Sequence, residues 1–447
     1  MICRRRMKIS AFVALLVCGG ICYYILATVH ESIRLAHTPQ LYKIHNRMGF
    51  PSEHGVGICN IKRNFMFVKV HKAGSTTTAC ILQRFGYEHN LTFVMAMDLR
   101  TDVGWPFLFK QEDIIPSADG TYNVLVDHTV YHRQLLDHIM PRDTVYISIL
   151  RHPLAQLRSV FNWYHYDKAF SGLKGPDPVA SFLEDPKKFQ IPYLTNFKAP
   201  MTKTRNFMAY DLGFPIGLHD DQSYVDEFVK KISREFDLIL ILEYFNESLI
   251  LLKRFMCWTL NDILYNVEPK NLRKYAKPTS SAALIQMHRE WSNVDYQLYD
   301  YFNSTLWRKI EEEENFYQEL RNFETVLQST ATYCANAIVK GPFEIEMVKN
   351  NGTVGGQSKG AKKKTVLTWV INSTAGILTV PRTAWNSEFD IDPRLCLKLK
   401  MEWKDWEYVL KRRHKLPENV SDTVKLAIRK FRPKTVLDKT LDTFHIK

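Results

Sequence analysis

The sequence predicts an α/β protein in which helices cover a central parallel sheet in three layers, with a helical C-terminal half and an N-terminal transmembrane helix. Two observations indicate the α/β class. Between residues 64 and 242, short apolar runs rich in β-branched residues alternate with stretches of helical periodicity, as in consecutive βαβ units. Beyond residue 243 the spacing of apolar positions is helical almost throughout. The 447 residues suffice for a large hydrophobic core.

Five runs are predicted as strands because they are short, apolar and rich in β-branched or aromatic residues. They are Phe65–Val70, Leu91–Met95, Tyr122–Val126, Val145–Leu150 and Leu238–Leu242. Helical periodicity predicts three helices among them: Ser75–Phe85, Leu154–Tyr166 and Tyr224–Ile232. Strands joined through helices run parallel, so the sheet should be mostly parallel.

The second half of the chain is predicted to be helical and to end in a smaller appended segment. The expected helices are Ser248–Trp258, Ala282–Trp291, Val294–Phe302 and Leu306–Leu327. Glycines and a Lys-Lys-Lys run in Gly341–Lys364 predict a mobile loop. We therefore expect an α/β domain at 61–335, a flexible basic loop at 336–365, and a Trp- and Lys-rich C-terminal extension at 366–447 that packs on the domain.

The N-terminus has the pattern of a membrane anchor. Three arginines and Lys8 precede Ile9–Val29, a run of 21 residues without charge. A helix of this length spans the hydrocarbon core of a bilayer, and the preceding positive charges keep the N-terminus cytoplasmic. A cleaved signal peptide has a shorter apolar core of about 7–15 residues and a small-residue cleavage site. We expect a cytoplasmic tail at 1–8, a signal anchor at 9–29 and a stem at 30–60.

Sequons agree with a lumenal or extracellular location after the anchor, whereas the cysteines give a mixed signal. Six N-x-S/T sequons are present, at Asn90, Asn246, Asn303, Asn351, Asn372 and Asn419. Five cysteines follow the anchor, at Cys59, Cys80, Cys257, Cys334 and Cys396. Because five is odd, at least one thiol stays free or pairs between chains, and a homodimer is allowed but not required. No C-x-x-C motif supports zinc or thioredoxin chemistry.

The net charge of +13 and the pI of about 9.2 predict anionic partners. Nucleotides, nucleic acids, lipid headgroups and acidic glycans all fit a basic protein. The sequence contains no RNP-type aromatic motif, zinc-finger spacing or basic zipper. Nucleic acid is therefore disfavoured as a partner.

Asn64–Thr78 is the first of two segments that carry chemistry. Its apolar strand stops near His71, and Gly74 then allows the backbone to approach an anion closely. Ser75–Thr77 supply hydroxyl and N–H donors at a helix start, where the helix dipole also favours negative charge. Lys72 adds a movable cation. Because this lysine precedes the glycine, the segment is not a Walker-type loop, and alone it also fits an ordinary helix N-terminus.

Thr144–Ser159 is the second segment. Arg151 directly follows a predicted strand, and its guanidinium can grip an anion with two parallel hydrogen bonds. Pro153 suits the first position of the following helix. Ser159 lies eight residues after the arginine, on that helix. Alone, this pattern is more typical of a surface arginine at a helix start.

The two segments together predict a single ligand site. Both follow predicted parallel strands, and ligands of such sheets bind at the carboxyl ends of the strands. Two cationic turns at one edge predict a ligand with two separated anionic groups. A nucleotide with phosphates at both ends of its ribose has this form.

These segments resemble the sulfotransferase superfamily. The residues that look like its 5′-phosphosulfate loop are Lys72, Ala73, Gly74, Ser75, Thr76 and Thr77. Arg151 and Ser159, at a spacing of eight, look like its 3′-phosphate pair. Further similarity in Leu238–Trp258 and Val294–Glu311, and more loosely to about Lys411, narrows the resemblance to the galactose-3-O-sulfotransferase family.

The resemblance implies a P-loop-like sulfotransferase fold and 3′-phosphoadenosine 5′-phosphosulfate as the sulfate donor, with no metal. It implies transfer of a sulfuryl group to the 3-hydroxyl of a terminal β-galactose, first of all on galactosylceramide or a related glycolipid. Glycoprotein glycans are the alternative acceptors. With the anchor, it implies a single-pass type II protein of the Golgi membrane with a lumenal catalytic domain. Lys72 would neutralise charge on the oxygen that leaves sulfur.

The resemblance also implies a catalytic histidine after the third predicted strand, and His128 lies there, 23 residues before Arg151. Histidine titrates near neutrality and can accept the proton of a sugar hydroxyl. Asp127 and Glu243 are alternative bases, because some superfamily members use a carboxylate. The i,i+4 spacing of His128 and His132 would suit a metal on a helix, but no third ligand has a suggestive spacing.

Two other classes of protein stay open. Asp390-Ile391-Asp392 is a D-x-D motif, which in a type II lumenal protein suggests a metal-dependent glycosyltransferase. It follows no apolar strand and lies in a predicted Pro-flanked loop, so chance is the better interpretation. A non-catalytic, membrane-anchored glycan-binding protein is the second class. The predicted loop Gly341–Lys364 departs from the family pattern.

Overall fold

The computed structural model of the chain describes residues 59–97, 102–189, 201–267, 281–347, 362–372, 374–422 and 424–426. The chain divides into two units, Met1–Gly57 and Ile58–Lys447, and every described residue belongs to the second. The predicted tail (1–8), the predicted anchor (9–29) and all but the last two residues of the predicted stem (30–60) lie outside the described residues. Within the described ranges, no helix is long and apolar enough to span a membrane.

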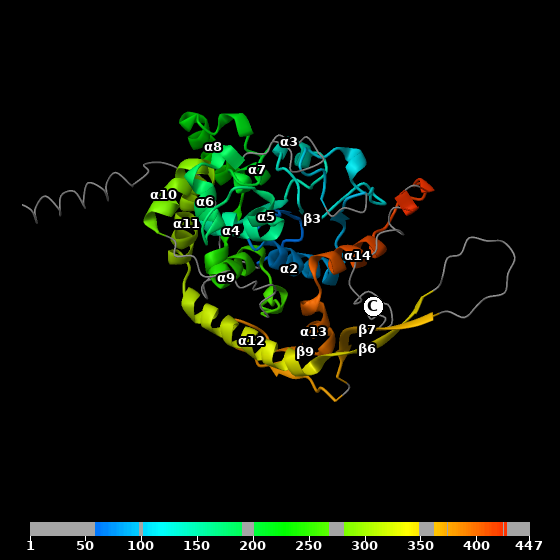
Figure 1. Ribbon diagram of the computed structural model, residues 1–447. Coiled ribbons are helices and arrows are strands. Elements are labelled where there is room, and N and C mark those ends of the chain that lie inside the picture. Colours follow the sequence, from blue (N-terminus) through cyan, green and yellow to red (C-terminus); the bar gives the residue numbers. More distant parts are fainter. Residues whose placement is uncertain are drawn as a thin grey trace, which may run out of the picture. The chain divides into compact units, whose positions relative to one another are not determined.

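A five-stranded parallel sheet forms the centre of the fold (Figure 1). Its order is β2-β3-β1-β4-β5, and all four pairings are parallel. The strands are β1 (Phe65–Val68), β2 (Phe93–Val94), β3 (Val124–Asp127), β4 (Val145–Leu150) and β5 (Leu238–Ile241). The prediction of a parallel sheet from these five runs is confirmed.

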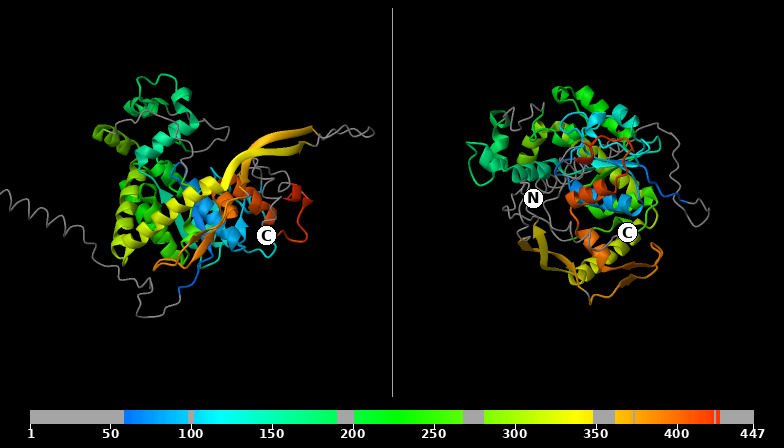
Figure 2. Two further views of the ribbon diagram at one scale, coloured as in Figure 1. Left: turned by 90° about the horizontal axis from the view of Figure 1, so that it is seen from below. Right: turned by 90° about the vertical axis from the view of Figure 1, so that its right-hand side faces the viewer.

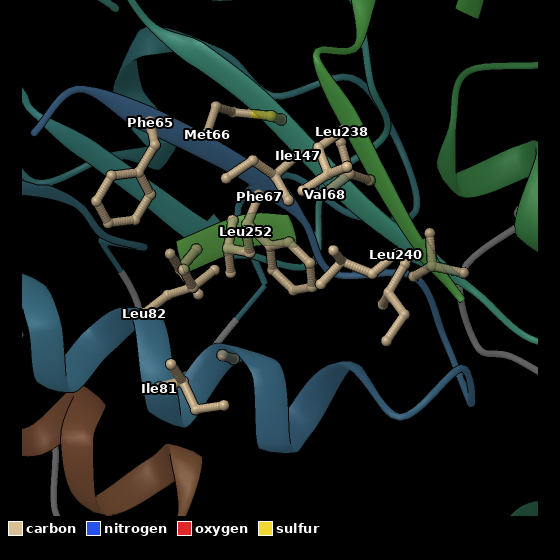
Figure 3. Close-up of a cluster of buried hydrophobic side chains, with 14 of the residues drawn as sticks. Phe65, Met66, Phe67, Val68, Ile81, Leu82, Ile147, Leu238, Leu240 and Leu252 are labelled. Carbon is tan, nitrogen blue, oxygen red and sulfur yellow. The ribbon is translucent and has the colours of Figure 1, made fainter. Parts of the chain in front are cut away.

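Both faces of the sheet are covered, as the central strand β1 shows. All four of its side chains have no exposed surface, and successive side chains of a strand point to opposite faces. Both faces are therefore covered, as in α/β proteins. Figure 3 shows the β1 side chains with Leu82 of α2 (Ser75–Glu88) and Leu252 of α9 (Phe245–Met256). Fully burying a side chain of this size contributes about 1.5–3 kcal/mol.

The helices predicted among the strands are present with small changes of boundary. Besides α2, they are α4 (Pro153–Tyr164) and α8 (Gln222–Glu235). The prediction that the second helix reaches Tyr166 is wrong, because His165 takes a left-handed conformation that ends α4. Unpredicted short helices are α3 (Arg133–Asp137), α5 (Tyr166–Ala169), α6 (Pro178–Glu184) and α7 (Phe207–Asp211), with 3₁₀ turns η1 (Gln111–Asp113), η2 (Pro186–Phe189), η3 (Ile216–Leu218), η4 (Leu242–Tyr244) and η5 (Asn261–Ile263).

The helical second half contains α9, α10 (Ala282–Trp291), α11 (Asn293–Glu311) and α12 (Phe316–Ala337). The predicted single helix Leu306–Leu327 is wrong, because the helical conformation is interrupted between α11 and α12. Four consecutive glutamates occupy 311–314, and negative charge at a helix C-terminus opposes the helix dipole. Asn315 then adopts a left-handed conformation and starts α12.

An antiparallel hairpin follows α12. Its strands are β6 (Ile338–Met347) and β7 (Lys362–Ile371), so the predicted loop Gly341–Lys364 is wrong at both ends. Residues 348–361 lie outside the described residues. β-branched residues at 365, 366, 368 and 370 favour a strand, and the glycines and lysines obscured this signal. Figure 2 shows the two-stranded ribbon continuing from the end of α12.

The C-terminal part adds β8 (Leu378–Val380), β9 (Phe389–Ile391), α13 (Pro393–Lys400) and α14 (Trp403–Arg413). Helix α14 lies beside α2 (Figure 1), and the Trp406 ring meets the Tyr87 ring edge-on at 5.5 Å. Disulfides join Cys59 to Cys257 and Cys334 to Cys396. Cys80 forms neither of these bonds.

Replacement of Arg84 tests whether its hydrogen bonds, which tie α2 to the segment 261–264, stabilise the fold. Its buried Nη2 lies 2.8–3.0 Å from the carbonyl oxygens of Asn261, Asp262 and Leu264. Arg84→Leu removes the charged donor from these acceptors, so we expect the free energy of unfolding to fall by about 3 kcal/mol. Urea denaturation measures it. The exposed control Arg63→Leu should change it by less than about 0.5 kcal/mol, and equal losses in both variants would contradict this role.

Candidate active site

The turn between β1 and α2 is held in a conformation that requires glycine. Lys72 and Gly74 have positive φ angles of 61° and 78°. A Cβ atom added to Gly74 would lie 2.3 Å from Cδ1 of Leu242, which follows β5. A side chain there meets both backbone strain and a steric clash. Glycine therefore permits the close approach of this turn to the carboxyl end of β5.

The turn presents the N-terminus of α2, and no side-chain hydrogen bond caps this helix. Ala73 is buried, and the buried Ser75 donates its hydroxyl to the Val70 carbonyl at 2.6 Å, which closes the turn. Thr76 is exposed and Thr77 is half-buried. An uncapped helix start combines N–H donors with the positive end of the helix dipole, so it suits an anion.

Arg151 joins the two predicted anion-binding segments. It follows β4, and its Nη1 donates to the Lys72 carbonyl at 3.2 Å. The Lys72 ammonium lies 3.9 Å from the ring centroid of Trp163, on α4. Burial, and then the charge of Arg151, lower the pKa of Lys72 to about 8. Burial also lowers the pKa of Arg151, against the attraction of Glu243. Two partly buried cations whose charges repel each other form a site that favours negative charge.

Two charged side chains near Arg151 already have hydrogen-bond partners. Arg158 makes two hydrogen bonds to Asp177, at 3.1 and 2.9 Å. Glu243 accepts the His152 backbone N–H at 2.9 Å and the Tyr299 hydroxyl at 3.3 Å. Ser159 is half-buried on α4, about 9 Å along the axis from the first residue of the helix. Arg151 is therefore the cation of this segment that faces the β1–α2 turn.

His128 directly follows β3 and stacks on His71, which lies in the turn after β1. Their ring centroids are 3.7 Å apart and the rings are inclined by 16°. The two rings come together because β3 and β1 are neighbours in register. Burial, then His71 and Lys69, lower the pKa of His128 well below its usual value. His128 is therefore neutral at physiological pH.

Lys69 is a site residue that the sequence analysis missed. Its Nζ lies 2.9 Å from Nε2 of His128 and 3.9 Å from the ring centroid of Trp403. Burial lowers the pKa of Lys69 to about 8, although Asp127 and Asp102 act to raise it. A lysine that ends a buried apolar strand was the available signal.

His71 and Asp211 form a second unpredicted pair. Nδ1 of His71 lies 2.9 Å from Oδ2 of Asp211, which also accepts the His71 backbone N–H at 2.7 Å. The Trp105 indole donates to Oδ1 of the same carboxylate at 2.9 Å. This carboxylate orients the His71 ring and leaves Nε2 as its accepting nitrogen. The two residues are 140 positions apart in sequence, so no local pattern could have revealed them.

The structure does not support a helical metal pair of His128 and His132, whereas Asp127 stays an alternative base. Asp127 is buried and accepts the His128 backbone N–H at 2.7 Å, and burial, with Glu407 and Asp102, raises its pKa. His132 lies before α3 in an extended conformation, so it shares no helix with His128. Within the described ranges, no group of three or more His, Cys, Asp or Glu residues is placed to hold a metal ion.

The D-x-D residues have structural contacts. Asp390 lies in β9 and accepts the Thr379 hydroxyl at 2.7 Å. Asp392 caps α13 by accepting the Leu395 N–H at 2.7 Å. The prediction of a loop here is wrong, because the first two residues of the motif belong to a strand. Both carboxylates therefore have hydrogen-bonding roles within the fold.

Five of the six sequons lie in the described residues, and Asn351 does not. Asn90 and Asn419 are exposed. The Asn246 side chain hydrogen-bonds Glu324 and Tyr265. Asn303 and Asn372 are half-buried, with Oδ1 of Asn303 fully covered.

Comparison with known proteins assigns a family. A family model described as galactose-3-O-sulfotransferase matches residues 3–339. The chain belongs to this family. It is 33% identical over 259 residues to galactosylceramide sulfotransferase of Homo sapiens, covering 57% of this chain and 59% of the relative. It is 33% identical over 255 residues to galactose-3-O-sulfotransferase 2 of Homo sapiens, covering 56% and 62%.

A third member, galactose-3-O-sulfotransferase 3 of Mus musculus, is 30% identical over 307 residues, covering 67% of each chain. The matched region thus spans less than two thirds of the length of the first two relatives. The family match ends at residue 339, within β6. Helices α13 and α14 lie beyond it.

Substitution of Gly74 tests the contact between the β1–α2 turn and the end of β5. Gly74→Ala should lower the free energy of unfolding by about 1–2 kcal/mol from the left-handed backbone and by about 1–3 kcal/mol more from the clash with Leu242. Gly172→Ala is the matched control, because its φ is +93° and an added Cβ meets nothing within 4 Å. Thermal and urea unfolding of both variants measure the difference. Equal losses would mean that Leu242 does not limit the turn.

Proposed function

We propose that this protein is a sulfotransferase that moves a sulfuryl group from 3′-phosphoadenosine 5′-phosphosulfate to the 3-hydroxyl of a terminal β-galactose. One observation carries the proposal: the hydrogen bond from Arg151 to the Lys72 carbonyl places two cationic turns at one edge of the sheet. Family membership supports the reaction class. The parallel sheet and the turn after β1 support a P-loop-like sulfotransferase fold with three layers.

The donor would bind across the two turns. Lys72 and the start of α2, with Ser75–Thr77, would hold the 5′-phosphosulfate, because N–H donors and the helix dipole converge there. Arg151 and Ser159 would hold the 3′-phosphate, with the guanidinium gripping two oxygens. A donor held at both ends of its ribose has its sulfur fixed in position. Positioning of this kind supplies a large share of the barrier reduction.

The chemical step is an in-line displacement at sulfur. The galactose 3-hydroxyl oxygen forms a bond to sulfur, and the bond from sulfur to the 5′-phosphate oxygen breaks. Adenosine 3′,5′-bisphosphate leaves with the electron pair of that bond, and the hydroxyl proton passes to a base. Lys72 would neutralise the charge that grows on the leaving oxygen, as in phosphoryl transfer. Its ammonium must then move from Trp163 toward the donor.

His128 is the proposed base, as the sequence predicted. It is neutral and lies at the carboxyl end of β3, and its Nε2 can receive a proton once the Lys69 ammonium, 2.9 Å away, moves off the lone pair of that nitrogen. His71 is the alternative that the structure adds, because Asp211 orients its ring. The two rings are stacked on each other, so mutagenesis must decide which of them is the base.

The proposal also includes the acceptor and the cellular location of the protein. We propose galactosylceramide or a related glycolipid as the acceptor, with glycoprotein glycans as the alternative, because the relatives of this chain include galactosylceramide sulfotransferase and galactose-3-O-sulfotransferases 2 and 3. The run Ile9–Val29 supports a single-pass type II protein of the Golgi membrane. Residues 61–335 would form the lumenal sulfotransferase domain, and residues 366–447 would be an extension that packs on it.

The direct test incubates the protein with ³⁵S-labelled donor and four acceptors: galactosylceramide, lactosylceramide, and type 1 and type 2 disaccharides. We expect label on the 3-hydroxyl of galactose, and preference among the acceptors would define the substrate class. No labelled product with any galactose acceptor, from protein that is folded by circular dichroism, would refute the proposed function.

Lys72→Ala tests transition-state stabilisation. We expect kcat to fall by about 10²–10³-fold, as when one preorganised stabiliser is removed. The exposed Lys168→Ala should leave kcat unchanged. Steady-state kinetics with saturating donor measure both, and near-full activity of Lys72→Ala would remove Lys72 from the mechanism.

Arg151→Ala tests the 3′-phosphate site. We expect the Kd for adenosine 3′,5′-bisphosphate to rise by at least about tenfold, because a charged hydrogen bond to phosphate contributes about 1.5–3 kcal/mol. Arg158→Ala is the control, because Arg158 is already paired with Asp177. Isothermal titration calorimetry measures the affinities. Equal Kd values for wild type and Arg151→Ala would contradict the placement of the donor.

The base is tested with His128→Asn and Asp211→Asn. If His128 takes the proton, its replacement should lower kcat by about 10²–10⁴-fold with little change in the Kd for adenosine 3′,5′-bisphosphate. Asp211→Asn removes the carboxylate that orients His71 and should have a smaller effect. A larger loss in Asp211→Asn than in His128→Asn would transfer the role to His71.

A further inference from the structure

A loop between β2 and β3 borders the two stacked histidines. Asp102 and His128 form an isolated parallel bridge, and the Val103 N–H donates to the His128 carbonyl at 2.9 Å. The ring centroid of Trp105 lies 4.5 Å from that of His71. This loop therefore lies on the side of the site where the acceptor hydroxyl would give up its proton.

Lys203, which precedes α7, lies against the same loop. Its Nζ is 5.8 Å from the ring centroid of Trp105 and 4.4 Å from the ring centroid of Tyr164, which belongs to α4. Three segments that are distant in the sequence thus meet around one ammonium. Only the tertiary structure brings this lysine to the site.

The ammonium of Lys203 has hydrogen-bond donors to offer a ligand. The side chain is half-buried. Within the described ranges, its Nζ contacts the two rings but has no hydrogen-bond or ion-pair partner. An ammonium carries three N–H donors, and on its open side these would bind water. A ligand hydroxyl can replace such a water without loss of the hydrogen bond.

Lys203 belongs to the acceptor side of the site rather than to the donor side. Burial lowers its pKa, and the opposing charge is that of Asp102, beside His128. The pKa of Lys72, by contrast, is lowered by burial and then by Arg151. In an in-line displacement the entering and leaving oxygens lie on opposite sides of sulfur. Because Lys72 would face the leaving oxygen, groups beside the histidines would face the entering one.

A galactose that reacts at its 3-hydroxyl presents two neighbouring hydroxyls, at positions 2 and 4. Binding sites for small molecules combine aromatic or apolar walls with a few placed polar groups. Trp105 and Tyr164 supply the walls here. The indole N–H of Trp105 is already bonded to Asp211, so Lys203 is the donor of this corner that a sugar hydroxyl can use.

We propose that Lys203 is an acceptor-binding residue that donates a hydrogen bond to a galactose hydroxyl adjacent to the reacting one. This inference rests on the proposed function and deepens it, because it names how the acceptor sugar is recognised. The hydrogen bond fixes the 3-hydroxyl beside the base and selects sugars with a hydroxyl in the adjacent position. Glycolipids and glycoprotein glycans that end in galactose share this sugar, so the contact applies to both.

Pairing Lys203→Met with deoxy sugars isolates this hydrogen bond. Methionine keeps an apolar stem against the rings and removes the donors. We expect kcat/KM for methyl β-galactoside to fall by about 10- to 100-fold, the range of one hydrogen bond to a charged group. Either the 2-deoxy or the 4-deoxy galactoside should react at rates within about threefold in wild type and variant, because the two changes remove the same contact.

Two other results would overturn the proposal. An equal loss with all three sugars would mean that Lys203 acts on the sulfuryl group or on folding, and an unchanged kcat/KM would mean that it contacts no acceptor. The Kd for adenosine 3′,5′-bisphosphate should not change in Lys203→Met, and a rise would assign the residue to the donor. The matched control is Lys168→Met, an exposed lysine of α5, which should leave kcat/KM unchanged for all three sugars.

An NMR titration of the protein with methyl β-galactoside, in the presence of adenosine 3′,5′-bisphosphate, gives a readout that is independent of catalysis. We expect the Kd for the galactoside to rise by about tenfold or more in Lys203→Met. Equal Kd values, or no binding by wild type, would overturn the inference even if the protein transfers sulfate. Absence of sulfate transfer by wild type would refute the proposed function instead, and the titration would still test the role of Lys203.

Discussion

The hydrogen bond between Arg151 and the Lys72 carbonyl joins the two halves of the proposed donor site. It forms because β1 and β4 are adjacent and in register, so the turns that follow them open at the same edge. The burial of all four β1 side chains fixes this arrangement. A slip of β1 by one residue would exchange its two faces and separate the turns. The packing of one short strand therefore supports the geometry of the whole site.

A layer of buried charge lies behind the site. Lys69, Asp127 and Glu407 are all nearly inaccessible to water, and burial shifts the pKa of each toward the neutral form. Such groups are costly for folding unless they contact one another. The turn after β1, strand β3 and helix α14 each contribute one of these residues, so the C-terminal extension and the sheet are coupled through electrostatics as well as through apolar packing.

Sequence reasoning succeeded where a local pattern reports the structure directly. Val145–Leu150 was predicted with correct bounds because a buried parallel strand is a continuous apolar run. It failed where local signals conflict. The acidic run before Asn315 broke a helix that periodicity alone would continue, and glycines and lysines concealed the strands of the β6–β7 hairpin. In the site, Lys72 and Arg151 were visible because glycine and proline mark their turns, whereas Lys69 had no such marker.

The sequence by itself determined the five strands of the central sheet, the helices α2, α4 and α8 among them, the two cationic turns and the family resemblance, because each of these is encoded in consecutive residues. The tertiary structure decided which distant side chains share one small volume. His71 meets Asp211 across 140 positions, and Trp403 reaches Lys69 from the far end of the chain. The physical reason is that hydrogen bonds and ring contacts act over a few ångströms, and only the packing of helices on the sheet brings such residues within that distance.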